Sequence, residues 1–382
     1  MDEPTFYLES YGCSASTANA EIIAGLLERA GMLRVSSPEH ASVIILNTCI
    51  VKAPTEHRMK RRIVELSAFS GKRLIVSGCM PDAEKDEILR LAPKAVLLGS
   101  HHVRRILEAA LNGRSFTGYS KEVKLGLPRE MSNPAISIIP ISEGCLGNCA
   151  YCAVKLAKGG LHSYPLDKIV KEAERSIKAG IREIWLTSQD NSAYGRDYAE
   201  KSQLPVLLES ISSLKGMFWV RVGMMNPDSI LPVLDRLIIQ FRSEKIFKFI
   251  HIPVQSGNDE VLKRMRRRYT VDDFNSIITE FRKKIPRITV ATDIICGFPG
   301  ESEQQFEDSL RLVDWLRPDV LNISRFWAMP GTEAYSMQGM LNGNETKERS
   351  RRLSLLFEKI SLEKNKAEVG SEYTVLIDEN LG

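Results

Sequence analysis

The chain has 382 residues, 43% hydrophobic and 26% charged, which is the profile of a globular protein with two or three domains. Its apolar runs end after strand length, which excludes a membrane-spanning helix of about 20 residues. The N-terminal sequence MDEPTFYLES lacks the basic and apolar regions of a secretory signal, and seven cysteines are too few for a disulfide scaffold. We therefore expect a cytoplasmic protein, whose formal net charge of +4 permits an anionic partner without requiring one.

The first region alternates short apolar runs with longer stretches of helical periodicity, the pattern of a parallel sheet flanked by helices. Strands are predicted at 5–10, 42–48, 73–78 and 95–100, and helices at 18–30, 56–69, 83–91 and 102–111. The residues that follow are rich in Gly, Ser, Lys and Pro and show no sustained periodicity. The sequence thus predicts an N-terminal domain at 1–115 and a linker at 116–134.

A second alternating region contains six apolar strands separated by helical segments. These strands are predicted at 135–142, 182–188, 218–224, 247–254, 288–297 and 320–326. Runs such as LDKIVKEAERSIKAG repeat their apolar residues every three or four positions, which gives each helix one core-facing stripe. Six such units predict a barrel, complete or open, in a domain at 135–365.

The C-terminal segment begins with a long charged helix after Glu345 and ends in EYTVLIDENLG, which predicts one more strand. A lone strand does not fold by itself. The segment at 366–382 therefore either adds to the preceding domain or begins a third one.

A cysteine triplet follows the first strand of the second region: ISEGCLGNCAYCAV carries Cys145, Cys149 and Cys152 in a CxxxCxxC spacing. A loop can fold these thiols around a four-iron cluster, and three ligands leave one iron open to an amino acid cofactor. Zinc is the main alternative, but zinc sites usually take four ligands in paired spacings, and no second CxxC or His pair completes the set. Buried structural cysteines fit poorly with so glycine-rich a loop.

The triplet, with Tyr151 before its last cysteine, resembles the signature of the radical S-adenosylmethionine (SAM) enzymes. The resemblance implies a (β/α)6 partial TIM barrel, a 4Fe-4S cluster on the triplet, and SAM bound with Tyr151 against its adenine. Ligands of such folds bind beyond the carboxyl ends of parallel strands, where each predicted strand carries polar residues. The candidate SAM contacts are Tyr151, Thr187, Ser188, Gln189, Arg221, Gln255, Asp293 and Phe326.

Three further cysteines, Cys13, Cys49 and Cys79, each lie at or just past the end of a predicted strand of the first region. If these strands are parallel and close in the sheet, the thiols converge at one edge and could hold a second cluster. The alternative is three unrelated cysteines, and geometry alone leaves both interpretations open. Cys296 lies within a predicted strand and is expected in the core.

The combination of YGC, NTC and SGCM with a radical SAM domain resembles the methylthiotransferases over nearly the whole chain. This resemblance implies an auxiliary 4Fe-4S cluster on Cys13, Cys49 and Cys79, and makes EYTVLIDENLG similar to the first strand of an RNA-binding TRAM β-barrel. The stretches NTCIVKAPTEHRMKRRI and YGCSASTANAEIIAGLL resemble the archaeal and eukaryotic branch that modifies N6-threonylcarbamoyladenosine in tRNA.

The activity that this resemblance implies is that of a tRNA methylthiotransferase of the EC 2.8.4 class. It would methylthiolate carbon 2 of N6-threonylcarbamoyladenosine at position 37, in the anticodon stem-loop, with one SAM supplying a 5'-deoxyadenosyl radical and a second SAM the methyl group. An electron donor and a sulfur source are implied partners, and we expect a monomer. Isopentenyladenosine in tRNA and an aspartate of a ribosomal protein are alternative substrates. A non-catalytic iron-sulfur or RNA-binding protein is the alternative class.

Substrate contacts are expected at Asn47, which lies in the turn before Cys49 and could line a cavity for the extruded base, and at Arg266 and Arg268. The two arginines belong to one of three basic clusters, at 60–62, 264–268 and 349–352, that could contact phosphates or form solvated helix faces. The chain departs from the family pattern where KGGLHSY replaces an RGxxRSR-like stretch and where Met329 replaces a frequent Arg. Lys158 keeps the charge there but lacks the planar fork.

Overall fold

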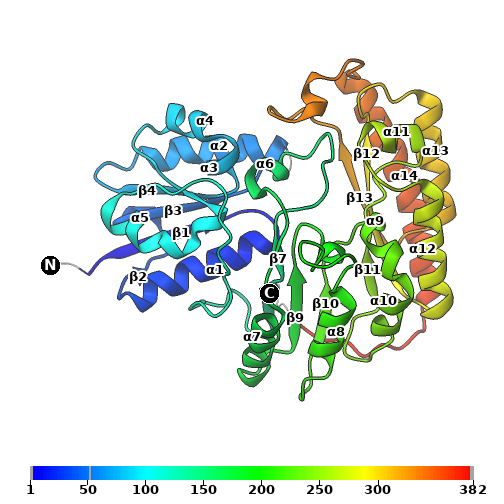
Figure 1. Ribbon diagram of the computed structural model, residues 1–382. Coiled ribbons are helices and arrows are strands. Elements are labelled where there is room, and N and C mark those ends of the chain that lie inside the picture. Colours follow the sequence, from blue (N-terminus) through cyan, green and yellow to red (C-terminus); the bar gives the residue numbers. More distant parts are fainter. Residues whose placement is uncertain (1–2, 51–52, 379–382) are drawn as a thin grey trace. The chain divides into compact units, whose positions relative to one another are not determined.

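The computed structural model describes residues 3–50 and 53–378 (Figure 1). The chain divides into two compact units, one formed by residues 1–145 and 153–176 and the other by residues 146–152 and 177–382. The boundary falls inside the loop of the cysteine triplet. In consequence, residues 135–145 and 153–176, predicted to belong to the second domain, pack with the first unit.

The first unit is built on a five-stranded parallel sheet in the order β2-β1-β3-β4-β5. All four predicted strands form, together with a short fifth strand at the edge. β3 is fully buried and lies between β1 and β4, which places the ends of these three strands side by side. The strands are β1 (Thr5–Ser10), β2 (Leu33–Arg34), β3 (Val43–Thr48), β4 (Arg73–Gly78) and β5 (Val96–Gly99).

Helices cover this sheet, and α1 and α5 contribute apolar side chains such as Ile22, Ile23 and Ile106 to its core. The predicted helix at 18–30 starts four residues earlier, at Ser14, because Cys13 already has the extended conformation of an N-cap residue. The helical elements are α1 (Ser14–Arg29), η1 (Pro38–His40), α2 (Ala53–Ser67), α3 (Met80–Ala83), α4 (Lys85–Leu91), η2 (Ser100–Arg105) and α5 (Ile106–Asn112).

The predicted linker contains neither a helix nor a regular strand, but it is not exposed throughout, since Lys124 is 1% and Leu125 8% exposed. After it, the first unit continues with further elements, of which β7 and β8 form a short antiparallel pair. They are β6 (Ile136–Pro140), β7 (Ser142–Glu143), α6 (Val154–Lys158), β8 (His162–Ser163) and α7 (Leu166–Lys178).

The second unit repeats strand and helix, and its strands pair in parallel, β9 with β10 and β12 with both β11 and β13. α12, α13 and α14 lie along one side of β11–β13 (Figure 1). α12 and α13 begin with capping boxes, at Thr270 and Ser302, that satisfy their first backbone N–H groups. The elements are β9 (Glu183–Thr187), η3 (Asn191–Ala193), α8 (Leu204–Ser212), β10 (Trp219–Val222), α9 (Pro227–Ile230), η4 (Leu231–Val233), α10 (Leu234–Phe241), β11 (Phe249–His251), α11 (Asp259–Arg264), α12 (Val271–Lys284), β12 (Thr289–Cys296), α13 (Glu303–Leu316), β13 (Val320–Arg325), η5 (Glu333–Ser336) and α14 (Gly343–Glu368).

The predicted α/β fold class is confirmed, since a parallel α/β sheet is followed by the strand–helix repeats of a partial barrel. The predicted C-terminal strand is wrong for the part that the structure describes: residues 371–378 form neither a strand nor a helix. Because a strand requires a neighbour for its hydrogen bonds, the strand-like composition of this segment is not sufficient. No helix in the described ranges is long and apolar enough to cross a bilayer.

Candidate iron-sulfur and substrate sites

Cys13, Cys49 and Cys79 come together at the carboxyl edge of the first sheet. Cys49 directly follows β3, and Cys79 directly follows β4 and donates its backbone N–H to Thr48 O at 3.2 Å. Gly12, beside Cys13, packs so tightly that an added Cβ would lie 3.0 Å from the Cβ of Cys49. The expectation that these strands are parallel neighbours is therefore confirmed.

Electrostatics also tie the three thiols together. Burial raises the pKa of the Cys79 thiol to about 12, Lys158 acts to lower it, and the neighbouring Cys49 and Cys13 raise it further. Thiolates crowded in this way are stabilised when a metal centre binds them, because coordination deprotonates a thiol. The donor set of three thiols fits an iron-sulfur cluster with one open iron.

Asn47 holds the turn that carries Cys13. Its side chain is fully buried, and its amide donates to Ser10 Oγ at 2.9 Å, Ser16 O at 2.9 Å and Ser16 Oγ at 3.0 Å. These bonds join the end of β3 to the end of β1 and the start of α1. The side chain thus positions a thiol-bearing turn, and its predicted contact with substrate stays a prediction.

The described residues contain no group of three His, Cys, Asp or Glu side chains placed to hold one metal ion. In an iron-sulfur cluster the thiolates bind different irons and so lie farther apart than the ligands of one zinc ion. The absence of such a group among the described residues therefore bears on a single zinc ion rather than on a cluster.

The triplet loop is fixed separately on each side of the unit boundary. In the first unit, the Cys145 N–H donates to Gly159 O at 3.3 Å, and its carbonyl accepts from Lys155 Nζ. Gly144 has φ of +73°, and a Cβ there would lie 1.9 Å from Gly160 O, so the close approach requires glycine. In the second unit, the Cys152 N–H donates to Cys149 O at 3.1 Å.

Arg267 contacts a triplet thiol, a role that the sequence did not predict. Its Nη1 lies 3.2 Å from Cys149 Sγ, while Nη2 donates to Asn226 Oδ1 at 3.1 Å and Nε to Tyr269 Oη at 2.8 Å. The left-handed conformation of Arg266, with φ of +57°, turns the chain so that Arg267 faces the thiol. The signal in the sequence was the RRR run itself, but nothing in it distinguished the middle arginine.

The two arginines predicted to contact substrate point elsewhere. Arg266 forms an ion pair with Glu333 at 2.6 Å, and Arg268 one with Asp228 at 2.9 Å. Both arginines are exposed, so contacts with phosphate remain predictions for them. In the third basic cluster, Arg349 is 2% exposed and bonds Glu301 Oε2 at 2.8 Å, which leaves it out of reach of a nucleic acid.

The predicted adenine contact, Tyr151, lies in an aromatic cluster of the second unit. Its ring meets Phe298 edge-on at 6.4 Å, and Phe298 meets Phe326 edge-on at 5.3 Å. The loop is anchored there by hydrogen bonds of Ala150, which donates to Met265 O at 3.1 Å and accepts from the Ala334 N–H at 2.8 Å. Two of the candidate SAM contacts, Tyr151 and Phe326, thus share one apolar wall.

Polar side chains at the end of β9 fit an amino acid ligand. Thr187 ends the strand and is buried, and the following Ser188 and Gln189 each bury an oxygen, Oγ and Oε1, that has no partner in the described part of the chain. Buried polar atoms are nearly always hydrogen-bonded in folded proteins. These orphaned atoms therefore fit a site for the polar groups of SAM.

The remaining candidate SAM contacts occupy the neighbouring strands. The Arg221 guanidinium stacks 4.5 Å from the ring of Trp185, and burial lowers its pKa. Gln255 has φ of +73° and bonds the backbone of β12, while the carboxylate of Asp293 accepts from His251 Nε2 at 3.1 Å. Cys296, at the end of β12, is fully buried, as the prediction of a core cysteine requires.

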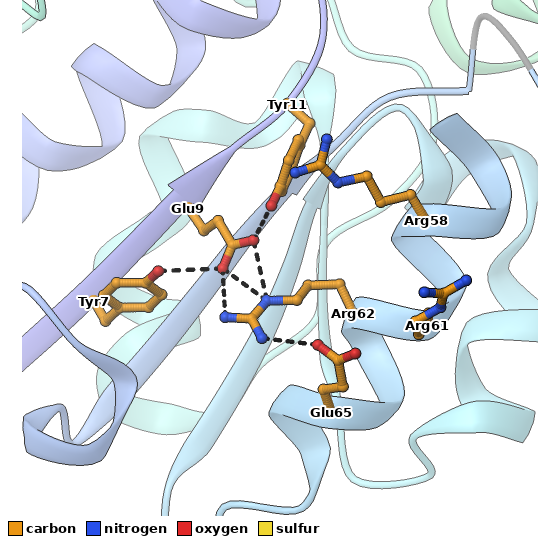
Figure 2. A pocket seen from close by; sticks show the side chains of 7 residues that line it. All are labelled: Tyr7, Glu9, Tyr11, Arg58, Arg61, Arg62 and Glu65. Atoms are coloured by element: carbon orange, nitrogen blue, oxygen red, sulfur yellow. Dashed lines mark hydrogen bonds and ion pairs between the residues drawn. The ribbon is translucent and has the colours of Figure 1, made fainter. Parts of the chain in front are cut away.

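A pocket in the first unit is lined by residues of β1 and α2 and by Tyr11, which directly follows β1 (Figure 2). Arg62 closes one side through an ion pair with Glu9 at 2.9 Å. Arg58 stacks its guanidinium 4.6 Å from the ring of Tyr11, two residues before Cys13. Neither Arg58 nor Arg61 pairs with a carboxylate of the described residues, so the pocket offers positive charge beside an aromatic face.

The strand–helix repeats and the thiol-bearing loop define a radical SAM protein, and comparisons with known proteins agree. Residues 139–313 match the Radical SAM superfamily, and residues 5–99 match the Uncharacterized protein family UPF0004. A probable threonylcarbamoyladenosine tRNA methylthiotransferase of Methanothermobacter thermautotrophicus is 41% identical over 99% of this chain and 90% of its own length. The corresponding protein of Pyrococcus abyssi is 43% identical over 97% of this chain and 88% of its own length.

The chain belongs to the threonylcarbamoyladenosine tRNA methylthiotransferase family, and the predicted family is thereby confirmed. The member from Drosophila pseudoobscura is 38% identical, over 98% of this chain and 68% of its own length. Among solved structures, a radical SAM methyltransferase from Kitasatospora setae shares the fold with a TM-score of 0.65 at 14% identity, covering 87% of this chain and 77% of that one.

Proposed function

We propose that this enzyme methylthiolates carbon 2 of N6-threonylcarbamoyladenosine in the anticodon stem-loop of tRNA. The observation that carries the proposal is the convergence of Cys13, Cys49 and Cys79 at one sheet edge, in a chain that also has the CxxxCxxC loop. A radical SAM loop alone fits many reactions. A second set of three thiols supports one in which sulfur is transferred.

Each thiol set has its own role in this proposal. Cys145, Cys149 and Cys152 would hold the 4Fe-4S cluster that binds SAM, and Cys13, Cys49 and Cys79 would hold the auxiliary cluster. When bound, the first cluster would supply the electron that cleaves SAM, and the sulfur would reach the substrate from the side of the auxiliary cluster. Tyr151 and Phe326 would pack on the adenine of SAM, and Ser188 and Gln189 would bond its polar groups.

The pocket of Figure 2 supports the choice of nucleoside. The threonylcarbamoyl group carries a carboxylate, whereas the isopentenyl group of the alternative substrate is a hydrocarbon. Arg58, which stacks on Tyr11, and Arg61, which also lines the pocket, suit a carboxylate attached to an aromatic base, because a guanidinium binds a carboxylate through charge-assisted hydrogen bonds. An apolar substituent would gain no such bonds from these two arginines.

The proposal is tested with anaerobically purified, reconstituted enzyme. We expect about eight irons per chain, and about four after Cys13, Cys49 and Cys79 are replaced by Ala. Mass spectrometry of nucleosides should detect methylthio-threonylcarbamoyladenosine after incubation with SAM, a reductant, a sulfide source and tRNA that carries the precursor. Conversion of isopentenyladenosine instead, or full iron content in the triple variant, would contradict the proposal.

The same proposal includes partners and a location. Electrons would come from a donor protein and sulfur from a separate source, and a monomer acting on tRNA in the cytoplasm suffices for the reaction. Gel filtration of the reconstituted enzyme, with and without tRNA, measures the oligomeric state.

A further inference from the structure

Three charged side chains are buried together in the first unit. Lys124, Glu143 and Lys158 are each at most 3% exposed, although they come from the predicted linker, from β7 and from α6. Lys158 Nζ bonds Glu143 Oε2 at 2.8 Å, and Lys124 Nζ bonds Glu143 Oε1 as well as Asn19 Oδ1 at 3.0 Å. Both lysines therefore share a single carboxylate.

The charges of this group do not balance. Two ammonium ions and one carboxylate leave one net positive charge, and no other carboxylate of the described residues forms an ion pair with either lysine. The nearby carboxyl of Asp82 accepts instead from the backbone N–H groups of Ser100 at 3.1 Å and Gly118 at 2.7 Å. An unpaired buried charge costs several kcal/mol, so the group requires an anion.

Lys158 faces the thiols that the proposed function assigns to the auxiliary cluster. α6, which ends at Lys158, packs against α3, and α3 begins directly after Cys79. Burial acts to lower the pKa of Lys158, but Glu143 and then Cys79 and Cys13 raise it above its usual value. Lys124 bonds the other oxygen of Glu143, and burial lowers its pKa to about 8, while Glu143 and, to the smallest extent, Cys79 act to raise it.

A cluster bound by the neighbouring thiols would supply the anion that balances this charge. An oxidised 4Fe-4S cluster bound by three thiolates carries one net negative charge, which matches the surplus of the group. We propose that Lys158 is the buried counter-ion of the auxiliary cluster and that it sets the reduction potential of this cluster. The inference rests on the proposed function, since it needs a cluster on Cys13, Cys49 and Cys79.

A fixed cation stabilises the reduced cluster, which carries one more negative charge. Removing the cation should therefore make the cluster harder to reduce. We expect Lys158→Met to shift the redox equilibrium toward the oxidised form by at least tenfold, which is about 59 mV for one electron. Lys158→Arg, which keeps the charge, should keep most of the wild-type potential.

The experiment uses the full chain with Cys145, Cys149 and Cys152 replaced by Ala, so that only the auxiliary cluster assembles. The protein is reconstituted with iron and sulfide and titrated with a titanium(III) reductant while the reduced cluster is followed by electron paramagnetic resonance. Lys168→Met, an exposed lysine on α7, is the matched control and should leave the potential unchanged.

Two double variants keep the test decisive if Lys158→Met does not fold. Lys158→Met with Glu143→Gln, and Lys124→Met with Glu143→Gln, each remove one lysine and the carboxylate and so leave equal net charge. The inference requires that only the first double variant, which lacks Lys158, has a lower reduction potential than the parent protein, because Lys158 faces the thiols. An unchanged potential there refutes the inference and leaves the function standing, whereas no cluster in the parent protein refutes both.

Discussion

Replacing Arg267 by Gln should lower the reduction potential of the triplet cluster. The guanidinium lies 3.2 Å from Cys149 Sγ and is oriented by Asn226 and Tyr269, so its charge is held in place. A charge-assisted hydrogen bond contributes about 1.5–3 kcal/mol, and partial exposure of this arginine reduces that to about 1–2 kcal/mol between redox states. For one electron this difference corresponds to about 40–90 mV.

The assay is a redox titration, followed by electron paramagnetic resonance, of protein in which Cys13, Cys49 and Cys79 are Ala. Arg268→Gln is the control, because it removes an arginine of the same run that pairs with Asp228 at 2.9 Å instead. Arg267→Lys should fall between the two, since it keeps the charge but loses the bonds to Asn226 and Tyr269. Equal potentials for Arg267→Gln and Arg268→Gln would refute the reasoning.

Three further predictions concern the rest of the chain. Arg349→Met leaves the buried carboxyl of Glu301 without its ion pair and should lower the unfolding free energy, measured by chemical denaturation, by about 3–5 kcal/mol. Adding Glu301→Gln should recover part of this loss, and equal stability of the single and double variants would contradict the prediction. Burial raises the pKa of Asp190 to about 6, so the protonated form is favoured on folding. The wild type should lose about 2 kcal/mol of stability relative to Asp190→Asn as pH rises from 4 to 7, and parallel stability curves would count against this prediction. Arg58→Ala with Arg61→Ala should raise KM for tRNA bearing threonylcarbamoyladenosine about tenfold or more, and an unchanged KM would exclude these arginines from substrate binding.

The sequence predicted what depends on local pattern. Cys49 and Cys79 follow β-branched apolar strands, and a parallel sheet brings such positions to one edge. Strand prediction therefore allowed their convergence with Cys13, but the strand order that makes β1, β3 and β4 neighbours came only from the structure. The same argument placed Ser188 and Gln189 beyond β9, where two buried oxygens lack partners in the described part of the chain.

What the sequence did not predict depends on partners that are distant along the chain. Lys124 stands in a segment with the composition of a linker, and its partners lie 19 and 105 residues away, at Glu143 and Asn19. In the sequence, Arg267 could not be distinguished from Arg266 and Arg268. The left-handed conformation of Arg266 directs the three side chains to different partners. The prediction of a C-terminal strand was wrong for a different reason: the composition of the segment suits a strand, but residues 371–378 form no strand.

The burial of Lys124 and Lys158 around Glu143 has a consequence for the order in which the enzyme matures during synthesis. A nascent chain that has emerged only as far as residue 115 already carries Cys13, Cys49 and Cys79, but neither lysine of the buried group. The counter-ion of the auxiliary site arrives only after Lys158 has left the ribosome. Loading of this site with iron and sulfur should therefore follow synthesis of the triplet loop, so that both sets of thiols mature together.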